Sequence, residues 1–182
     1  ESLMRCMLVT GAAVAALSSA ASADVVLNFT NFSATGFQFS QIVAPGSLTG
    51  MLTGVSVNAT LLSSSAFTYA DDLCVYVDVL PLSTLGMVQV GGYSDLGALQ
   101  RYSWPNGASD AVGTVVSGAA MFTTAIDMST PNIAIWLGNG YGAAGTAGSW
   151  TGSITLHGVE AVPGPGALAL LMLAGFTARR RR

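Results

Sequence analysis

Apolar and polar residues alternate along most of the chain from residue 24 to residue 160, and this two-residue period constrains the fold more than any other feature. Successive side chains of a β-strand point to opposite faces, so a strand with one buried face has this pattern. The clearest run is 73–79, where leucine and valine alternate with Cys74, Tyr76 and Asp78. Shorter runs occupy 25–29, 37–39, 55–61, 88–90, 133–137 and 150–156. The pattern predicts eight or nine strands and no convincing helix.

Turn residues separate these runs. Pro45-Gly46 and Gly91-Gly92 lie between strands, and a glycine-rich stretch at 138–148 is predicted to be a hairpin loop. Strands with one polar side suit antiparallel sheets that each bury one face. The sequence therefore predicts an all-β domain at residues 24–160, an antiparallel β-sandwich with a jelly-roll or immunoglobulin-like strand order.

The charges exclude one class of function. Between residues 24 and 166 there are eight acidic side chains and a single arginine, Arg101, and the chain has no lysine. Nucleic-acid binding requires a basic surface that displaces counterions from phosphates. We therefore expect no nucleic-acid partner.

The first 23 residues have the three parts of a secretory signal peptide, in order. Arg5 is a positively charged start, residues 7–17 form a short apolar segment, and Ala21-Ser22-Ala23 is a cleavage site. The sequence therefore predicts an N-terminal signal helix and a mature protein that begins at Asp24. Cys74 is then the one cysteine left, and its acidic neighbours predict an unreactive thiol.

Two motifs suggest enzyme chemistry, but neither has the context it needs. The sequence GYGAAG (140–145) matches a dinucleotide fingerprint, yet a turn and a strand follow it instead of a helix. His157 is the only histidine, and a Ser–His–Asp triad or a zinc site would have to use it. No nucleophile elbow or second ligand accompanies it, so we expect a surface histidine.

Asp71 and Asp72 are the candidate ligand residues of the domain. Paired carboxylates on a loop can bind Ca²⁺, but a turn-capping role is favoured because no ladder of oxygen ligands follows. Asp72 and Asp78 are the carboxylates that a glycosidase would use. Six aromatic residues could form a platform for sugar rings or pack in the core: Tyr93, Tyr102, Trp104, Trp136, Tyr141 and Trp150.

The last 21 residues, VPGPGALALLMLAGFTARRRR, combine a proline motif, an apolar run and a basic end. A helix from Pro165 to Ala178 would be about 21 Å long, against a hydrocarbon core of ~30 Å. Flanking arginines can extend the effective span, and they suit the cytoplasmic side of a membrane. We therefore expect a short C-terminal transmembrane helix.

This ending resembles the bacterial PEP-CTERM sorting signal, and the resemblance covers residues 161–182 only. The sorting motif is Val162, Pro163, Gly164 and Pro165, and the basic cluster is Arg179, Arg180, Arg181 and Arg182. Gly164 stands where the family has a glutamate. The resemblance implies processing by an exosortase, a protease or transpeptidase of the inner membrane.

Together these features predict an exported, non-enzymatic bacterial protein that is anchored briefly at the inner membrane and then reaches the cell surface or extracellular matrix. The expected partners are an exosortase, the membrane and, as a candidate, an extracellular polysaccharide. No cofactor is expected apart from Ca²⁺ as an open alternative. The alternative function is a lectin-like sandwich that binds a glycan or Ca²⁺.

Overall fold

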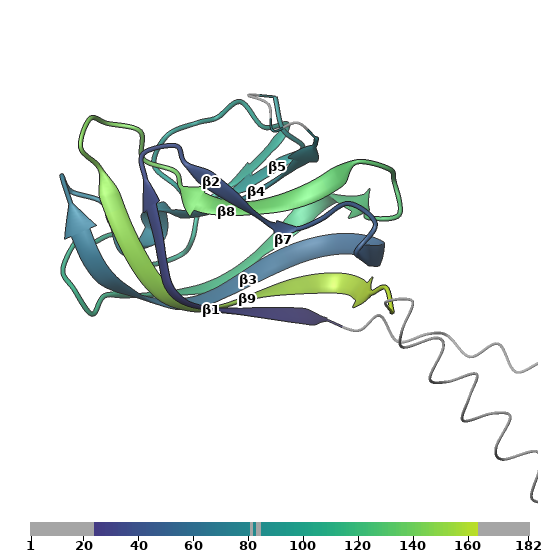
Figure 1. Cartoon of the computed structure of the whole chain (residues 1–182), viewed down its shortest axis with the longest axis horizontal. Coiled ribbons are helices and arrows are strands. Elements are labelled where there is room, and N and C mark those ends of the chain that lie inside the picture. The colour runs from purple at the N-terminus through teal and green to yellow at the C-terminus, as the bar shows by residue number, and fades with distance from the viewer. Residues whose placement is uncertain (1–23, 81, 83–84, 164–182) are drawn as a thin grey trace, which may run out of the picture.

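The computed structural model describes residues 24–80, 82 and 85–163, which form two β-sheets packed face to face (Figure 1). This confirms the all-β sandwich, and the nine strands agree with the expected number. The predicted signal helix and transmembrane helix lie outside the described residues. The elements are β1 (Val25–Thr35), β2 (Phe39–Val43), β3 (Leu48–Ser65), the 3₁₀ helix η1 (Ala70–Asp72), β4 (Leu73–Val79), β5 (Val88–Val90), β6 (Gln100–Tyr102), β7 (Val115–Asp127), β8 (Ile133–Asn139) and β9 (Ala147–Ala161).

The first sheet has the strand order β1-β9-β3-β7, and the second has the order β2-β8-β4-β5-β6. All pairs are antiparallel except β5 and β6, which run parallel. The expectation of purely antiparallel sheets was therefore wrong for this pair. The stretch 138–148 is not a hairpin, because β8 and β9 belong to different sheets. Both ends of the described chain leave the sandwich on the same side (Figure 1).

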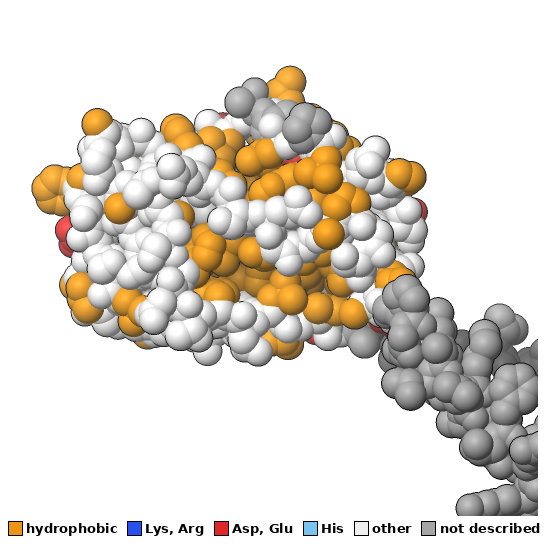
Figure 2. Space-filling view, viewed as in Figure 1, with side chains coloured by type: hydrophobic (Ala, Val, Ile, Leu, Met, Phe, Trp, Pro, Cys, Tyr) orange, Lys and Arg blue, Asp and Glu red, His pale blue; other side chains and the backbone are white. Residues whose placement is uncertain are grey.

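The main core lies between the sheets and includes apolar residues that the alternation placed on one face, together with residues such as Leu52 and Val116 that it did not. Leu73, Val75 and Val77 of β4 are fully buried there. Trp150 of β9 is also fully buried, and its indole N–H donates to the carbonyl of Ala70 at 3.1 Å. On the side seen in Figure 2, apolar side chains remain visible between the sheets and charged side chains are scarce.

The second sheet is buried on its outer face too, which corrects the expectation that each sheet packs on one face only. Tyr76 forms a small second core with Ala134 and Trp136, and Leu96 packs against it. The segment 91–99 covers this face. Gln89 holds the segment in place, because its side chain accepts the N–H of Leu96 and donates to two carbonyls.

Several strands differ from the sequence expectation. β1, β2 and β9 extend beyond the expected runs, β3 begins at Leu48 rather than at residue 55, and β6 and β7 were not identified from the sequence. The alternation of inward and outward side chains along β7 is interrupted, because the β3–β7 register shifts between Leu52 and Gly54. No helix in the described part of the chain is long and apolar enough to cross a membrane.

Candidate functional site

A pocket of about 510 Å³ opens where η1 meets the segments that follow β5 and β6. The pocket lies at the N-terminal end of β4 and at the C-terminal ends of β5 and β6. Aromatic side chains, two carboxylates and one guanidinium group converge here. The lining residues are Phe67, Tyr69, Asp71, Asp72, Gly91, Gly92, Tyr93, Arg101, Ser103, Trp104, Ala108 and Tyr141.

Asp72 connects two backbone segments of this pocket, one at Tyr69 and one at Tyr93. One carboxylate oxygen accepts the backbone N–H of Tyr69 at 2.7 Å, which confirms the expected turn-capping role. The other accepts the backbone N–H of Tyr93 at 3.0 Å. Burial, with a smaller contribution from the neighbouring charge of Asp71, raises the pKa of Asp72 to about 6, although both N–H donors favour the ionised form. Asp72 is therefore engaged in holding the backbone.

Asp71 is the carboxylate that remains available to a ligand. It is half-buried in the pocket wall, and burial raises its pKa above the ordinary value. Its backbone is held on both sides, because its N–H donates to Gly107 and its carbonyl accepts from Gly92. Among the described residues, no other side chain donates a hydrogen bond to its carboxylate. A hydroxyl group entering the pocket would find an acceptor here.

Arg101 also holds the segment that follows β5. Its guanidinium donates to the carbonyl of Gly92 at 3.2 Å and to that of Tyr93 at 2.9 Å. The guanidinium carries five N–H donors, so these two bonds leave others for a ligand. The side chain is exposed, and it is the only lysine or arginine in the described part of the chain.

The aromatic residues form the rim and the floor of the pocket. Tyr93 and Tyr141 meet edge to face with ring centroids 5.4 Å apart, and Tyr93 is 78% exposed. Phe67 is 72% exposed on a turn where its backbone has a positive φ of 61°. Trp104 is buried below, and its indole N–H donates to Leu73 at 2.7 Å. A large apolar residue held on a strained, exposed turn is unusual and makes this turn a candidate for function.

Half of the aromatic residues considered from the sequence lie at this pocket. Tyr93, Trp104 and Tyr141 line it. The other three belong to packing sites: Trp136 and Trp150 are buried, and Tyr102 stacks on Phe122. Sequence reasoning missed five lining residues, Phe67, Tyr69, Arg101, Ser103 and Ala108. The position of Phe67 and Tyr69 directly before Asp71 and Asp72 was the available signal.

Two consecutive glycines allow the segment after β5 to turn into the pocket. Gly91 and Gly92 have φ values of 78° and 83°, which other residues rarely adopt. A Cβ atom on Gly91 would lie 2.1 Å from the indole nitrogen of Trp104. The predicted turn at Gly91-Gly92 is therefore also a close approach of backbone to the pocket floor.

The chemistry of the described residues bears on the metal and thiol predictions. They contain no group of three or more histidine, cysteine, aspartate or glutamate side chains that could hold a metal ion. Ca²⁺ takes six or more oxygen ligands, and both oxygens of Asp72 already accept backbone N–H groups. Cys74 is fully buried, and burial raises the pKa of its thiol, so burial adds to the effect of its acidic neighbours.

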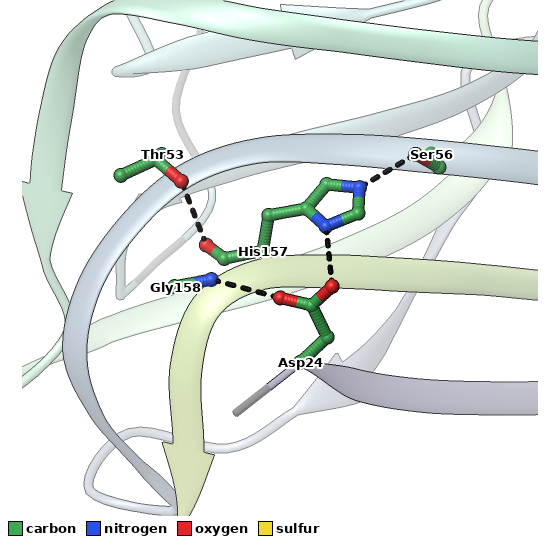
Figure 3. Close-up of polar contacts among 5 residues, drawn as sticks. All are labelled: Asp24, Thr53, Ser56, His157 and Gly158. Carbon is green, nitrogen blue, oxygen red and sulfur yellow. Dashed lines mark hydrogen bonds and ion pairs between the residues drawn. The ribbon is translucent and has the colours of Figure 1, made fainter. Parts of the chain in front are cut away.

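The predicted mature N-terminus lies at a second polar site, on the outer face of the first sheet. Asp24 contacts His157, which in turn contacts Ser56 (Figure 3). His157 lies on the outer face of the sheet, as the expected surface histidine would, but its side chain is partly buried and both ring nitrogens have partners.

Of the other predicted processing residues, only Val162 and Pro163 lie in the described part of the chain. Both are exposed. Ala21 and Ala23 of the cleavage site, Gly164 and Pro165 of the sorting motif and the four terminal arginines lie outside it. The sequence matches no family model, and comparison with curated proteins and with solved structures found no significant match.

Proposed function

We propose that this chain is an exported surface or extracellular-matrix protein whose sandwich binds a glycan in the pocket around Asp71. The observation that carries the proposal is the convergence of exposed aromatic rings, one available carboxylate and one guanidinium group on a single concave site. The domain then acts as a lectin-like module, which was the alternative function expected from the sequence. The proposal assigns no chemical reaction to this pocket.

The side chains of the pocket suit a sugar ring. The C–H faces of a sugar are apolar and stack on aromatic rings, as Tyr93 and Phe67 present here. Sugar hydroxyl groups donate to a carboxylate such as Asp71 and accept from N–H groups such as those of Arg101. A few polar groups set among aromatic side chains are typical of small-ligand sites.

The positions of the carboxylates support a non-enzymatic pocket. A glycosidase needs two carboxyl groups separated by roughly 5–9.5 Å. Asp72 directly precedes β4, and Asp78 lies six positions later, near the end of that strand. Six positions in an extended strand correspond to about 20 Å. Asp72 is moreover engaged with two backbone N–H groups.

The strand order supports a jelly-roll over an immunoglobulin-like arrangement. Strands β1, β3, β7 and β9 form one sheet, while β2, β4, β5 and β8 lie in the other, so the chain crosses between the sheets repeatedly. Two interleaved Greek keys of this kind define a jelly roll, a fold common among lectin domains. β6 adds a short parallel edge strand.

We also propose that both ends of the chain are export signals, with an N-terminal signal helix and a C-terminal transmembrane helix that an exosortase processes. The sorting motif begins at Val162, directly after the last residue of β9, and the N–H of Val162 donates to Ser47 at 2.9 Å. A cut beyond this point would leave every strand intact. Both described ends leave the sandwich on one side, which suits two segments directed to one membrane (Figure 1).

Glycan binding is tested by titrating the purified chain with extracellular polysaccharide fragments in a calorimeter and on a glycan array. We expect Tyr93→Ala and Asp71→Asn each to weaken binding at least about tenfold, the scale of one lost stacking or charged hydrogen-bond contact. Leu99→Ala is the control, since Leu99 is 84% exposed and does not line the pocket. Absence of binding to any glycan, or heat released by Ca²⁺ alone, would overturn the glycan assignment.

Export is tested separately by mass spectrometry of the mature protein's ends. The proposal expects an N-terminus at Asp24 and a C-terminus close to Pro163. Retention of Arg182 would contradict exosortase processing and leave a plain anchor. This result does not depend on whether the pocket binds a glycan.

A further inference from the structure

A histidine links an aspartate and a serine across three neighbouring strands on the outer face of the first sheet. Nδ1 of His157 lies 2.8 Å from Oδ2 of Asp24, and Nε2 of the same ring lies 2.6 Å from Oγ of Ser56. Asp24 directly precedes β1, His157 is on β9 and Ser56 is on β3, and these strands are adjacent in the order β1-β9-β3 (Figure 3).

The state of the Asp24 carboxylate determines which groups donate protons in the hydrogen bonds between Asp24, His157 and Ser56. Asp24 is held as a carboxylate, because the hydrogen bond with His157, followed by the N–H of Gly158, lowers its pKa. A carboxylate only accepts, so an imidazole that is neutral carries its proton on Nδ1. Nε2 is then an acceptor, and Ser56 must donate its hydroxyl proton to it. This is the arrangement by which Ser–His–Asp triads activate serine.

The backbone around His157 is irregular in a way that positions these groups. The β3–β9 register shifts between Gly50 and Gly54, and Gly158 has a φ of 85°. The N–H of Gly158 is thereby free to donate to Oδ1 of Asp24 at 3.3 Å. The hydroxyl of Thr53 donates to the carbonyl of His157 at 3.3 Å. Bulges of this kind often re-aim side chains next to active sites.

The surface beside His157 offers room for a small substrate. A shallow groove of about 720 Å³ is lined by Asp24, His157 and residues of the irregular segment, while Ser56 and Thr155 lie outside its lining. Two methionines, Met51 and Met121, give it apolar walls. Thr155 lies directly opposite Ser56 in the β3–β9 register, so its hydroxyl is on the same outer face as Ser56 and His157.

We propose that Ser56 is a nucleophile for short-chain acyl esters, with His157 as its general base and Asp24 as the residue that orients the imidazole. This goes beyond the proposed glycan pocket, which lies on other elements. Oγ of Ser56 attacks the ester carbonyl carbon while Nε2 of His157 takes the hydroxyl proton. The proton passes to the leaving alkoxide, which departs as an alcohol and leaves an acyl-serine. Water, deprotonated by His157, then cleaves the acyl-serine to release the acid and restore Ser56.

Thr155 supplies the donor for the developing oxyanion in this scheme. Its position opposite Ser56 brings the two Cβ atoms to roughly 5 Å, so that one hydroxyl can attack while the other donates. A single hydroxyl donor predicts slow turnover. Covalent labelling of Ser56 is therefore a sharper measurement than steady-state rates.

The test is to treat the folded full chain with a fluorophosphonate probe and locate the adduct by peptide mass spectrometry, with p-nitrophenyl acetate hydrolysis as a second readout. We expect one adduct, on Ser56. The labelling rate should fall about 10²-fold or more in His157→Gln, the scale of lost general-base catalysis, and at least about tenfold in Asp24→Asn. Thr155→Val should slow p-nitrophenyl acetate hydrolysis.

The matched control is Ser63→Ala. Ser63 and Ser149 lie on the same two strands with their hydroxyl oxygens 2.6 Å apart, but no histidine joins them, so labelling should be unchanged. Circular dichroism establishes that each variant is folded. Asp24→Asn provides a milder variant, since Asp24 lies just before the first strand. Absence of an adduct on Ser56, or equal labelling of wild type and His157→Gln, would overturn the proposal.

Discussion

The Asp72 carboxylate accepts the backbone N–H of Tyr93 at 3.0 Å, although the two residues lie 21 positions apart in the sequence. This bond connects η1 to the segment that follows β5. Because Asp72 also caps η1 through Tyr69, one carboxylate positions both an aromatic rim residue and the loop that carries Asp71. The pocket therefore depends on a residue that does not need to contact the ligand.

Asp72→Asn should destabilise the fold. Asparagine keeps one acceptor oxygen but presents an NH₂ group to the second backbone donor, which leaves a buried N–H unpaired. The expected loss in the free energy of unfolding is about 1–3 kcal/mol. Urea denaturation measures it, with Asp71→Asn as the control, because Asp71 makes no comparable side-chain bond to another residue. Equal stability of the two variants would contradict the linking role of Asp72.

The pKa of Asp72 predicts how stability changes with pH. Its pKa is raised from 3.8 to about 6 by burial, so the folded chain binds this proton more tightly than the unfolded chain does. Its contribution to the free energy of unfolding is then greatest below about pH 3.8 and decreases as the pH rises to about 6. Subtracting the pH profile of Asp72→Asn from that of the wild type isolates this slope. A difference that increases with pH in this window would contradict the prediction.

Asp24 should show the opposite pH dependence. Its pKa is lowered from 3.8 by the hydrogen bond with His157. The contact therefore stabilises the fold at pH values above 3.8, and the stabilisation is lost as the pH falls through the folded-state pKa. Thermal unfolding between pH 2 and 5 should show wild type losing more stability on acidification than Asp24→Asn. Parallel curves would indicate that the contact contributes nothing to stability.

Gly91→Ala should disrupt the pocket floor, whereas Gly113→Ala should be only mildly destabilising. Both glycines have positive φ values, 78° and 89°, so each substitution strains the backbone by roughly 1 kcal/mol. Only at Gly91 would the new Cβ lie 2.1 Å from Trp104; at Gly113 nothing lies within 4 Å. Gly91→Ala should therefore shift tryptophan fluorescence and cost more stability. Similar effects of the two substitutions would contradict the close approach.

Much of the fold could be predicted because alternation reports which side of a strand is buried. Leu73, Val75 and Val77 face the main core as their spacing requires. The other face of the same strand was misjudged, because a loop distant in sequence covers Tyr76. β7 was missed since the register shift near Leu52 breaks its period. Covering loops and bulges arise from packing between segments, which a local pattern does not contain.

The sequence by itself determined most of the strands and their inward faces, the turn at Asp71 and Asp72 and the scarcity of charge, because each depends on residues close together in the chain. Tertiary structure decided which side chains meet. His157 contacts Ser56 and Asp24 across 101 and 133 positions, and those contacts exist only because β1, β9 and β3 are neighbours in one register. A one-residue slip in that register would turn a strand's side chains to the opposite face, so pairing between distant strands creates the His157 site.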